Sequence, residues 1–422
     1  MTNLLSYPSL VESPFIIVEI GGYTFGDYKD EGYLLNGKVS YPNFMTSINI
    51  VKINGQVNTY TIHMVYQITK GDDPNMLDAI FSINKDKYGW QKIKISYGDW
   101  SCPSYIFKEE EAIISKIVSK IDFSGSRIEY DLSCTSTALP LMSNAFNFPA
   151  TVAKPSSVLM NLVCNKSYGL QNVFTGMPNR NAIINSGVIA SDDKEVKIEA
   201  KYGISPLAYM NFLVDCMSST DDSNDSIIKK SKYFLTLEDD INGIMGGPYF
   251  KVTKVDTKNL LNKSQDSADT YYVDIGYPGD NFVLGFTINN NDIWSIYYNY
   301  TKDLPQTNYV YRINNEGKLV TEYSPAISTS RELKYTTESS KTWWTSMTEF
   351  PITATLTIKG LMRPSMLMSK VRINSYFYGT KHISSGLYII TKQEDIVNTS
   401  GYRTVLTLTR VGVDQPWLQK LL

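Results

Sequence analysis

Apolar and polar residues alternate with a period of two along several stretches of this 422-residue chain. Four segments show the alternation most clearly: 61–69, 126–133, 352–359 and 402–409. In the second of these, Ile128, Tyr130 and Leu132 share one face of the expected strand, with charged residues between them. Because side chains along a strand point to opposite faces in turn, the pattern predicts antiparallel strands with one buried and one wetter face.

The strand-forming segments occur as two similar sets, one near each end of the chain. Lys92-Ile93-Lys94-Ile95 is matched by Lys370-Val371-Arg372-Ile373. The motif Ser-Gly-x-Arg, followed by a leucine, occurs twice with identical spacing, at Gly125, Arg127 and Leu132 and at Gly401, Arg403 and Leu408. We therefore predict that one β-module is present twice, with Gly125 superposed on Gly401 and Arg127 on Arg403. The alternative is a chance match between strands rich in Ser, Thr and Ile.

In the middle of the chain the hydrophobic period changes from two to that of a helix. Residues 156–163 carry apolar side chains at helical spacing. In residues 205–217, Ser205 can cap a helix, Pro206 suits its first position, and apolar residues recur on one face. Three further elements are predicted: strands at 233–237 and 249–255, and a short helix at 73–81.

These patterns predict an α+β fold that is mainly β, with two antiparallel β-modules flanking a mixed insert. The first module covers residues 1–140, the insert residues 141–270, and the second module residues 271–412, with a tail at 413–422. The boundary near residue 271 is soft, because the second module can recruit strands from 271–300. The total length suits roughly three domains.

Composition favours a protein that contacts other proteins. Charged residues make up 19% of the chain, and it has 30 tyrosines. Aromatic residues are enriched at protein interfaces, whereas Lys and Glu are depleted there. A coding bias towards Tyr, Asn, Ile and Lys is the alternative explanation. The net charge of −2 provides no basic surface for nucleic acid, and we expect no secretion signal and no membrane span.

Residues that would carry chemistry are scarce. The chain has two histidines, His63 and His382, without metal-ligand spacing, and its four cysteines are far apart. No sequence motif of a hydrolase or a nucleotide-binding loop occurs. Residues 221–225 resemble part of a calcium loop but lack its glycine and its final acid. We therefore expect no enzyme activity, no cofactor and no metal, although a carboxylate pair cannot be recognised from sequence alone.

The sequence resembles the baseplate or tail hub proteins of tailed phages, which are related to the N-terminal part of type VI secretion spikes. The block SGLYIITKQEDIVNTSGYRTVLTLTR at 385–410 carries most of the resemblance, following ATLTIKG at 354–360. Three looser segments support it: 58–83, 204–217 and 277–288. The likeness spans nearly the whole chain.

The resemblance implies that the two modules are tube-type β-barrels. It also implies a homotrimer in which three chains form a pseudo-sixfold ring between a hexameric tail tube and a threefold spike or tip. The expected partners are the tail tube protein, the spike or tip protein and other baseplate proteins, and DNA would pass through the ring without specific binding during genome ejection. The protein would be made in the host cytoplasm and reside in the virion tail. Two other functions stay open, a peptidoglycan hydrolase of the tail and a carbohydrate- or receptor-binding tail protein.

If DNA crosses such a ring, its wall is expected to be polar and neutral to acidic, since a basic wall would retain DNA through phosphate contacts. Five acidic residues are candidates for this lumen: Glu109, Glu110, Glu111, Glu129 and Asp131.

Overall fold

The computed structural model describes seventeen stretches of the chain, and all structural statements below refer to them. They are residues 14–26, 39–41, 45–71 without 69, 91–99, 107–136 without 123 and 125, 144–164, 189, 192–219, 232–238, 249–255, 269–275, 283–290, 309–313, 319–323, 352–360, 366–398 without 383, and 401–413. The predicted helix at 73–81, the segment 291–300 and the tail after Val413 lie outside these residues.

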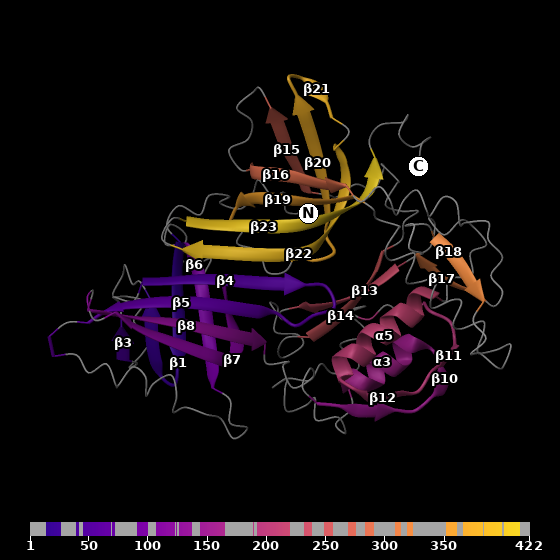
Figure 1. Cartoon of the computed structure of the whole chain (residues 1–422), viewed down its shortest axis with the longest axis horizontal. Coiled ribbons are helices and arrows are strands. Elements are labelled where there is room, and N and C mark those ends of the chain that lie inside the picture. Colours follow the sequence, from indigo (N-terminus) through magenta and orange to yellow (C-terminus); the bar gives the residue numbers. More distant parts are fainter. Residues whose placement is uncertain are drawn as a thin grey trace.

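Strands dominate the described part of the chain (Figure 1). The first half contains β1 (Pro14–Ile20), β2 (Tyr23–Gly26), β3 (Val39–Tyr41), β4 (Met45–Ile53), β5 (Thr59–Gln67), β6 (Lys92–Asp99), β7 (Phe107–Asp122), β8 (Arg127–Ser136), β9 (Phe146–Phe148), β10 (Thr151–Ala153), α3 (Pro155–Cys164), β11 (Val196–Ile198), β12 (Lys201–Ile204) and α5 (Pro206–Ser219). The second half contains β13 (Lys232–Glu238), β14 (Tyr249–Val255), β15 (Asp269–Ile275), β16 (Val283–Asn290), β17 (Tyr309–Ile313), β18 (Leu319–Tyr323), β19 (Ile352–Lys359), β20 (Lys370–Phe377), β21 (Thr380–Lys381), β22 (Gly386–Asn398) and β23 (Gly401–Val413).

Fifteen of these strands form one sheet, in which the same strand order occurs twice. The order β4-β5-β8-β7-β6 in the first set corresponds to β16-β19-β23-β22-β20 in the second. Neighbours within each set are antiparallel. The prediction of a mainly β, α+β fold is confirmed. Among the described strands, neither set closes on itself, so the barrel form implied by the resemblance is not seen as a closed ring of strands.

A β-bulge marks the same place in both sets. The extra residue is Ser115 in β7 and Thr391 in β22. The hydroxyl of Ser115 donates to the carbonyl of Ser133 at 2.9 Å, and the hydroxyl of Thr391 donates to the carbonyl of Thr407 at 3.3 Å. At both bulges, the ladder of backbone hydrogen bonds is interrupted, and the side-chain hydroxyl of the extra residue makes a hydrogen bond to the neighbouring strand, β8 or β23, instead. They give a residue-by-residue alignment of the two sets.

Strands β6 and β20 also pair in the same register when residues are counted from the two bulges. Lys92 lies opposite Ile113, and Lys370 lies opposite Ile389, each pair at the same distance from its bulge. This is the register in which the sequence matches Lys92 with Lys370.

In the last strands, the same count aligns Leu132 of β8 with Leu406 of β23, two residues before Leu408. Gly401 has a φ of +130°, a conformation that favours glycine. By the same count Arg127 corresponds to Gly401, two residues before Arg403. Gly125 lies outside the described residues, so the superposition of the two Ser-Gly-x-Arg motifs stays a prediction.

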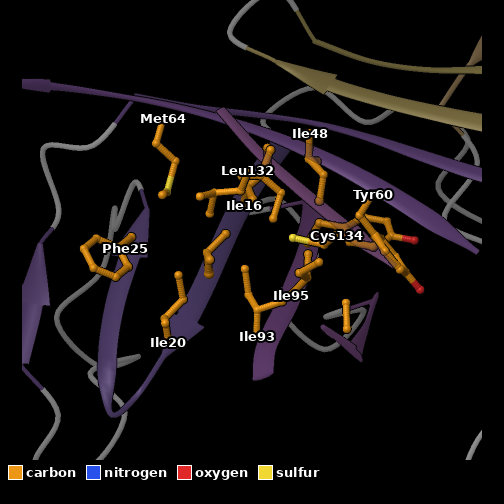
Figure 2. Packing of buried hydrophobic residues seen from close by; sticks show 14 of the residues in the cluster. Ile16, Ile20, Phe25, Ile48, Tyr60, Met64, Ile93, Ile95, Leu132 and Cys134 are labelled. Atoms are coloured by element: carbon orange, nitrogen blue, oxygen red, sulfur yellow. The ribbon is translucent and has the colours of Figure 1, made fainter. Parts of the chain in front are cut away.

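The sheet encloses two separate apolar cores, one for each set. In the first, side chains of β1 and β6 meet those of β4, β5 and β8; Figure 2 shows Ile93 and Ile95 pointing toward Ile48 and Leu132. The second core lies among β15, β19, β20, β22 and β23. The alternation noted in the sequence explains both, because every second side chain of these strands is buried.

A third core belongs to the insert, where α3 and α5 pack against each other and on short strands. Both predicted helices are confirmed, as are the strands predicted at 233–237 and 249–255. The hydroxyl of Ser205 accepts a hydrogen bond from the N–H of Ala208 at 3.2 Å, as expected of a cap. The ring of Tyr209 stacks on Phe148 with centroids 3.9 Å apart.

Asp193 supports the start of α3, a role that the sequence did not suggest. This residue is 2% exposed, and its carboxylate accepts hydrogen bonds from the backbone N–H and the hydroxyl of Ser156. Replacing Asp193 with Ala should lower the free energy of unfolding by about 2–3 kcal/mol, because two buried donors lose their acceptor. Urea denaturation measures the effect. Asp193→Asn keeps an acceptor and should lose much less, so equal losses in the two variants would contradict this role.

Within the ranges given above, neither helix has the length and apolar character needed to cross a membrane.

Candidate assembly surface and module junction

The two strand sets join edge to edge through β22 and β4, which lie side by side (Figure 1). The pairing is antiparallel and runs from Lys392 opposite Ile53 to Val397 opposite Ile48. We call this pairing the internal junction. It makes the polar and apolar faces of both sets continuous across one sheet, because residues directly opposite each other point to the same side.

The tip of the β22–β23 hairpin inserts into the core of the first set. Val397 and Tyr402 are buried there, and the ring of Tyr402 meets Tyr97 edge-on with centroids 6.2 Å apart. Gly360, just after β19, donates its N–H to the carbonyl of Tyr402 at 2.8 Å. A Cβ at Gly360 would lie 2.2 Å from the Tyr402 ring, so glycine is required for this approach.

A buried carboxylate sits at the centre of the internal junction. Asp395 is fully buried and accepts hydrogen bonds from Thr404 at 2.7 Å, Gln393 at 2.8 Å and the Tyr402 hydroxyl at 3.0 Å. The side-chain carbonyl of Gln393 accepts the N–H of Met366 at 2.7 Å. Each of these polar groups therefore has a defined partner, as burial requires.

Lys52 of β4 faces this network from the other strand. It is fully buried and lies opposite Gln393 in the ladder. Burial raises the pKa of Asp395 to about 6, while hydrogen bonds from Thr404 and the charge of Lys52 act in the opposite direction. A buried acid and a buried base thus meet where the two sets join.

The turn between β4 and β5 brings all three parts of the chain together. The N–H of Asn54 donates to the carbonyl of Thr391 in the second set, and the N–H of Gly55 donates to the carbonyl of Leu235 in the insert, at 3.2 and 2.7 Å. The side chain of Asn211 in α5 donates to the carbonyl of Gly55 at 2.9 Å. Gly55 has a φ of +72°, which glycine adopts without strain.

The opposite, wetter face of the sheet carries pairs of charges. In the first set, Asp131 accepts from Lys120 at 2.8 Å and lies 2.6 Å from the Nδ1 atom of His63. Hydrogen bonds from Lys120 and His63 lower the pKa of Asp131. Arg127 lies 3.2 Å from Glu129. Because these side chains are partly exposed, each pair contributes little to stability, but together they neutralise the carboxylates.

The second set has a similar pair on this face. Burial acts to raise the pKa of Glu394, but hydrogen bonds from Lys392 at 2.9 Å and Asn49 at 2.8 Å outweigh it and lower the pKa. Asn49 belongs to β4, so this contact also crosses the internal junction.

The structure brings together two of the five predicted lumen residues. Glu129 and Asp131 share the wetter face of β8. Glu111 is exposed in β7, opposite Lys94, while the side chains of Glu109 and Glu110 lie outside the described residues. Their place in a lumen stays a prediction.

In the described part of the chain, an edge is open at each end of the eight strands that connect the two sets. From Ser115 to Asp122, β7 pairs only with β8, and its Ile117 and Ile121 are 38% and 49% exposed. At the other end of the eight strands that connect the two sets, β16 pairs only with β19, and its Leu284 is 55% exposed. Open edges with apolar side chains favour pairing with another chain.

The described residues hold no group of three or more His, Cys, Asp or Glu placed to bind a metal ion. His63 is paired with Asp131, and Nδ1 of His382 lies 2.8 Å from the Ser384 hydroxyl. Burial raises the pKa of the Cys134 and Cys216 thiols to about 12, which makes them poor nucleophiles. The geometry here serves packing and pairing of strands.

Comparison with known proteins supports the fold. No protein-family model and no curated protein matches the sequence. A 43 kDa tail protein of prophage MuSo2 from Shewanella oneidensis matches with a TM-score of 0.50 and 12% identity, over 94% of this chain and 99% of that one. A tail protein from Neisseria meningitidis MC58 gives 0.49 and 9%, over 94% and 97%. A component of the Escherichia coli type VI secretion system, c3393, gives 0.44 and 8%, over 93% and 76%.

The first of these likenesses shows that the chain has the fold of a phage tail protein, and the resemblance stated from the sequence is confirmed at this level.

Proposed function

We propose that the chain is a structural protein of a phage tail, in which three copies form a pseudo-sixfold hub ring. The internal junction is the observation that carries the proposal, because it joins two strand sets of the same order edge to edge. Repeating that join between copies, second set to first set, would extend the sheet head to tail until it closes. Three chains would supply six sets, which suits a sixfold tube on one side and a threefold spike or tip on the other.

In this ring the wetter face of the sheet would line the passage for DNA. The described carboxylates Asp131, Glu129 and Glu394 lie beside cations, so the wall would be close to neutral. Such a wall would let DNA pass, since few unpaired cations would remain to bind phosphates.

Each part of the chain would then have its own role in the ring. We assign residues 1–140 and 271–412 to the two ring-forming modules, 141–270 to the insert, and 413–422 to a tail. The partners would be the tail tube protein, a spike or tip protein and other baseplate proteins. The protein would be made in the host cytoplasm and act in the virion, during genome ejection.

Native mass spectrometry and electron microscopy of the purified chain test the proposal. At high concentration we expect a species of three times 47.7 kDa and class averages with a threefold ring. A chain that stays monomeric at every concentration, or a ring of six chains, would overturn it.

A separate assay tests the absence of enzyme activity. The purified chain should give no clearing on a peptidoglycan zymogram, because Asp395 is buried and the histidines already have partners. Clearing that disappears when one carboxylate is replaced would identify the chain as a hydrolase instead.

A further inference from the structure

The internal junction and the open edge of β7 present different chemistry at equivalent positions. After its bulge, β22 places Gln393, Asp395 and Val397 on the core side of the sheet. At the same distances after its own bulge, β7 places Ile117, Ser119 and Ile121 on that side. The polar network of the internal junction is therefore replaced by mostly apolar residues at the open edge.

The neighbouring strands confirm that these residues correspond. Asp395 lies opposite Thr404 of β23, and Ser119 lies opposite Tyr130 of β8. Thr404 and Tyr130 are both fully buried, so both strands face the core at this point. The difference between Asp395 and Ser119 is thus one of chemistry and not of orientation.

The strands that would pair with β22 and β7, namely β4 and β16, also differ in having a charged or an uncharged residue on the core side. β4 offers Ile48, Ile50 and the buried Lys52 on the core side, and pairs there with β22. β16 corresponds to β4 in strand order, and its half-buried Phe286 and Ile288 pack on the second core. In the register fixed by the bulges, Asn290 holds the position of Lys52.

We propose that the charged pair Lys52 and Asp395, called here the pairing key, makes β4 pair selectively with β22. We also propose that the apolar edge of β7 pairs with β16 of a second copy. The partner is another copy of this chain because the internal junction supplies the template for the join. In the internal junction, Ile396 of β22 lies opposite Asn49 of β4. The equivalent positions are Lys120 in β7 and Thr287 in β16, so these two residues would lie opposite each other between copies. The inference rests on the proposed ring and specifies which strands close it.

The key works through the penalty for burying a charge without its partner. If β7 of a second copy took the place of β22 on β4, Lys52 would face Ile117 and lose the carboxylate of Asp395. If β22 paired with β16, Asp395 would face apolar side chains without a lysine. Both wrong joins separate the buried lysine from the buried carboxylate, so the alternating order of modules is favoured.

Transferring the key to the open edge tests the inference in the full chain. Ser119→Asp should weaken trimer formation at least tenfold, measured as the concentration for half assembly by native mass spectrometry. The double variant Ser119→Asp with Asn290→Lys should recover assembly, because the new lysine meets the new carboxylate across the join. Ser47→Asp places the same charge on the wetter face of β4 and should assemble like the natural chain.

A chemical cross-link gives a second readout. With cysteines at Lys120 and Thr287, a short bismaleimide should link copies into covalent dimers and trimers. Cysteines at Lys120 and Asn49 should not link copies.

The outcomes separate this inference from the proposed ring. A natural chain that forms no trimer contradicts the ring itself. A natural chain that forms trimers while Ser119→Asp assembles normally, or whose loss is not recovered by Asn290→Lys, contradicts only the strands named here.

Discussion

Replacing Gly360 with alanine should lower the free energy of unfolding by about 3 kcal/mol, near the upper end of what overpacking costs. The added methyl would lie 2.2 Å from the Tyr402 ring. That ring has little freedom to move, because it meets Tyr97 and its hydroxyl donates to Asp395. The backbone is held as well, since the Gly360 N–H donates to the Tyr402 carbonyl. Urea denaturation followed by tyrosine fluorescence measures the loss.

Two further variants make the result specific. Gly285→Ala should change the stability by less than about 0.5 kcal/mol, because its new Cβ would meet Thr357 at 3.9 Å, an ordinary contact. In a background with Tyr402→Leu, the Gly360→Ala change should lose most of its effect, because the ring is gone. An equal loss in both backgrounds would mean that the clash with Tyr402 is not the cause.

The second large effect concerns pH. Stability of the natural chain relative to Asp395→Asn should rise as the pH falls from about 7 to about 4. The folded pKa of Asp395 is about 6, above its ordinary value of 3.8, so the folded chain binds a proton that the unfolded chain has released. The full effect is about 3 kcal/mol, at about 1.4 kcal/mol per pKa unit.

Urea midpoints at several pH values measure this difference. Lys52 and the Tyr402 hydroxyl are the other titratable groups that act on the pKa of Asp395. Glu394→Gln is the matched control, because the pKa of Glu394 is lowered and its contribution should be lost as the pH falls. Parallel curves for the natural chain and Asp395→Asn would refute the assignment.

Much of the fold could be predicted from alternation and capping signals. The strands β5, β8, β19 and β23 follow from their period of two, and α5 follows from its cap and apolar face. The 16-residue strand β7 could not be recognised in the same way. Its bulge at Ser115 shifts the alternation by one residue. In addition, Ala112, Ile113 and Ile114, just before the bulge, are buried in succession, so the strand does not show a simple period of two.

The internal junction could not be predicted from the sequence for a different reason. Lys52, Gln393 and Asp395 are polar residues, and a sequence pattern places such residues on the wet side of a strand. They are buried because their strands pair across most of the chain, and no local pattern encodes a partner that distant. A signal was present in retrospect. Gln393 and Asp395 share a face with Val397, so β22 has a mixed face where β8 has a purely apolar one.

The distance along the chain between β4 and β22 also bears on how the protein is made. Asn49 and Glu394, which hydrogen-bond across the two strands, are 345 residues apart. At roughly 5–20 residues per second, a ribosome needs on the order of 17–70 s to cover that interval. Throughout this time β22 has not been synthesised, so the edge of β4 that carries Lys52 is not yet paired with it. A lysine on a waiting edge discourages pairing with other nascent chains, so the residue that secures the finished junction also protects the unfinished one.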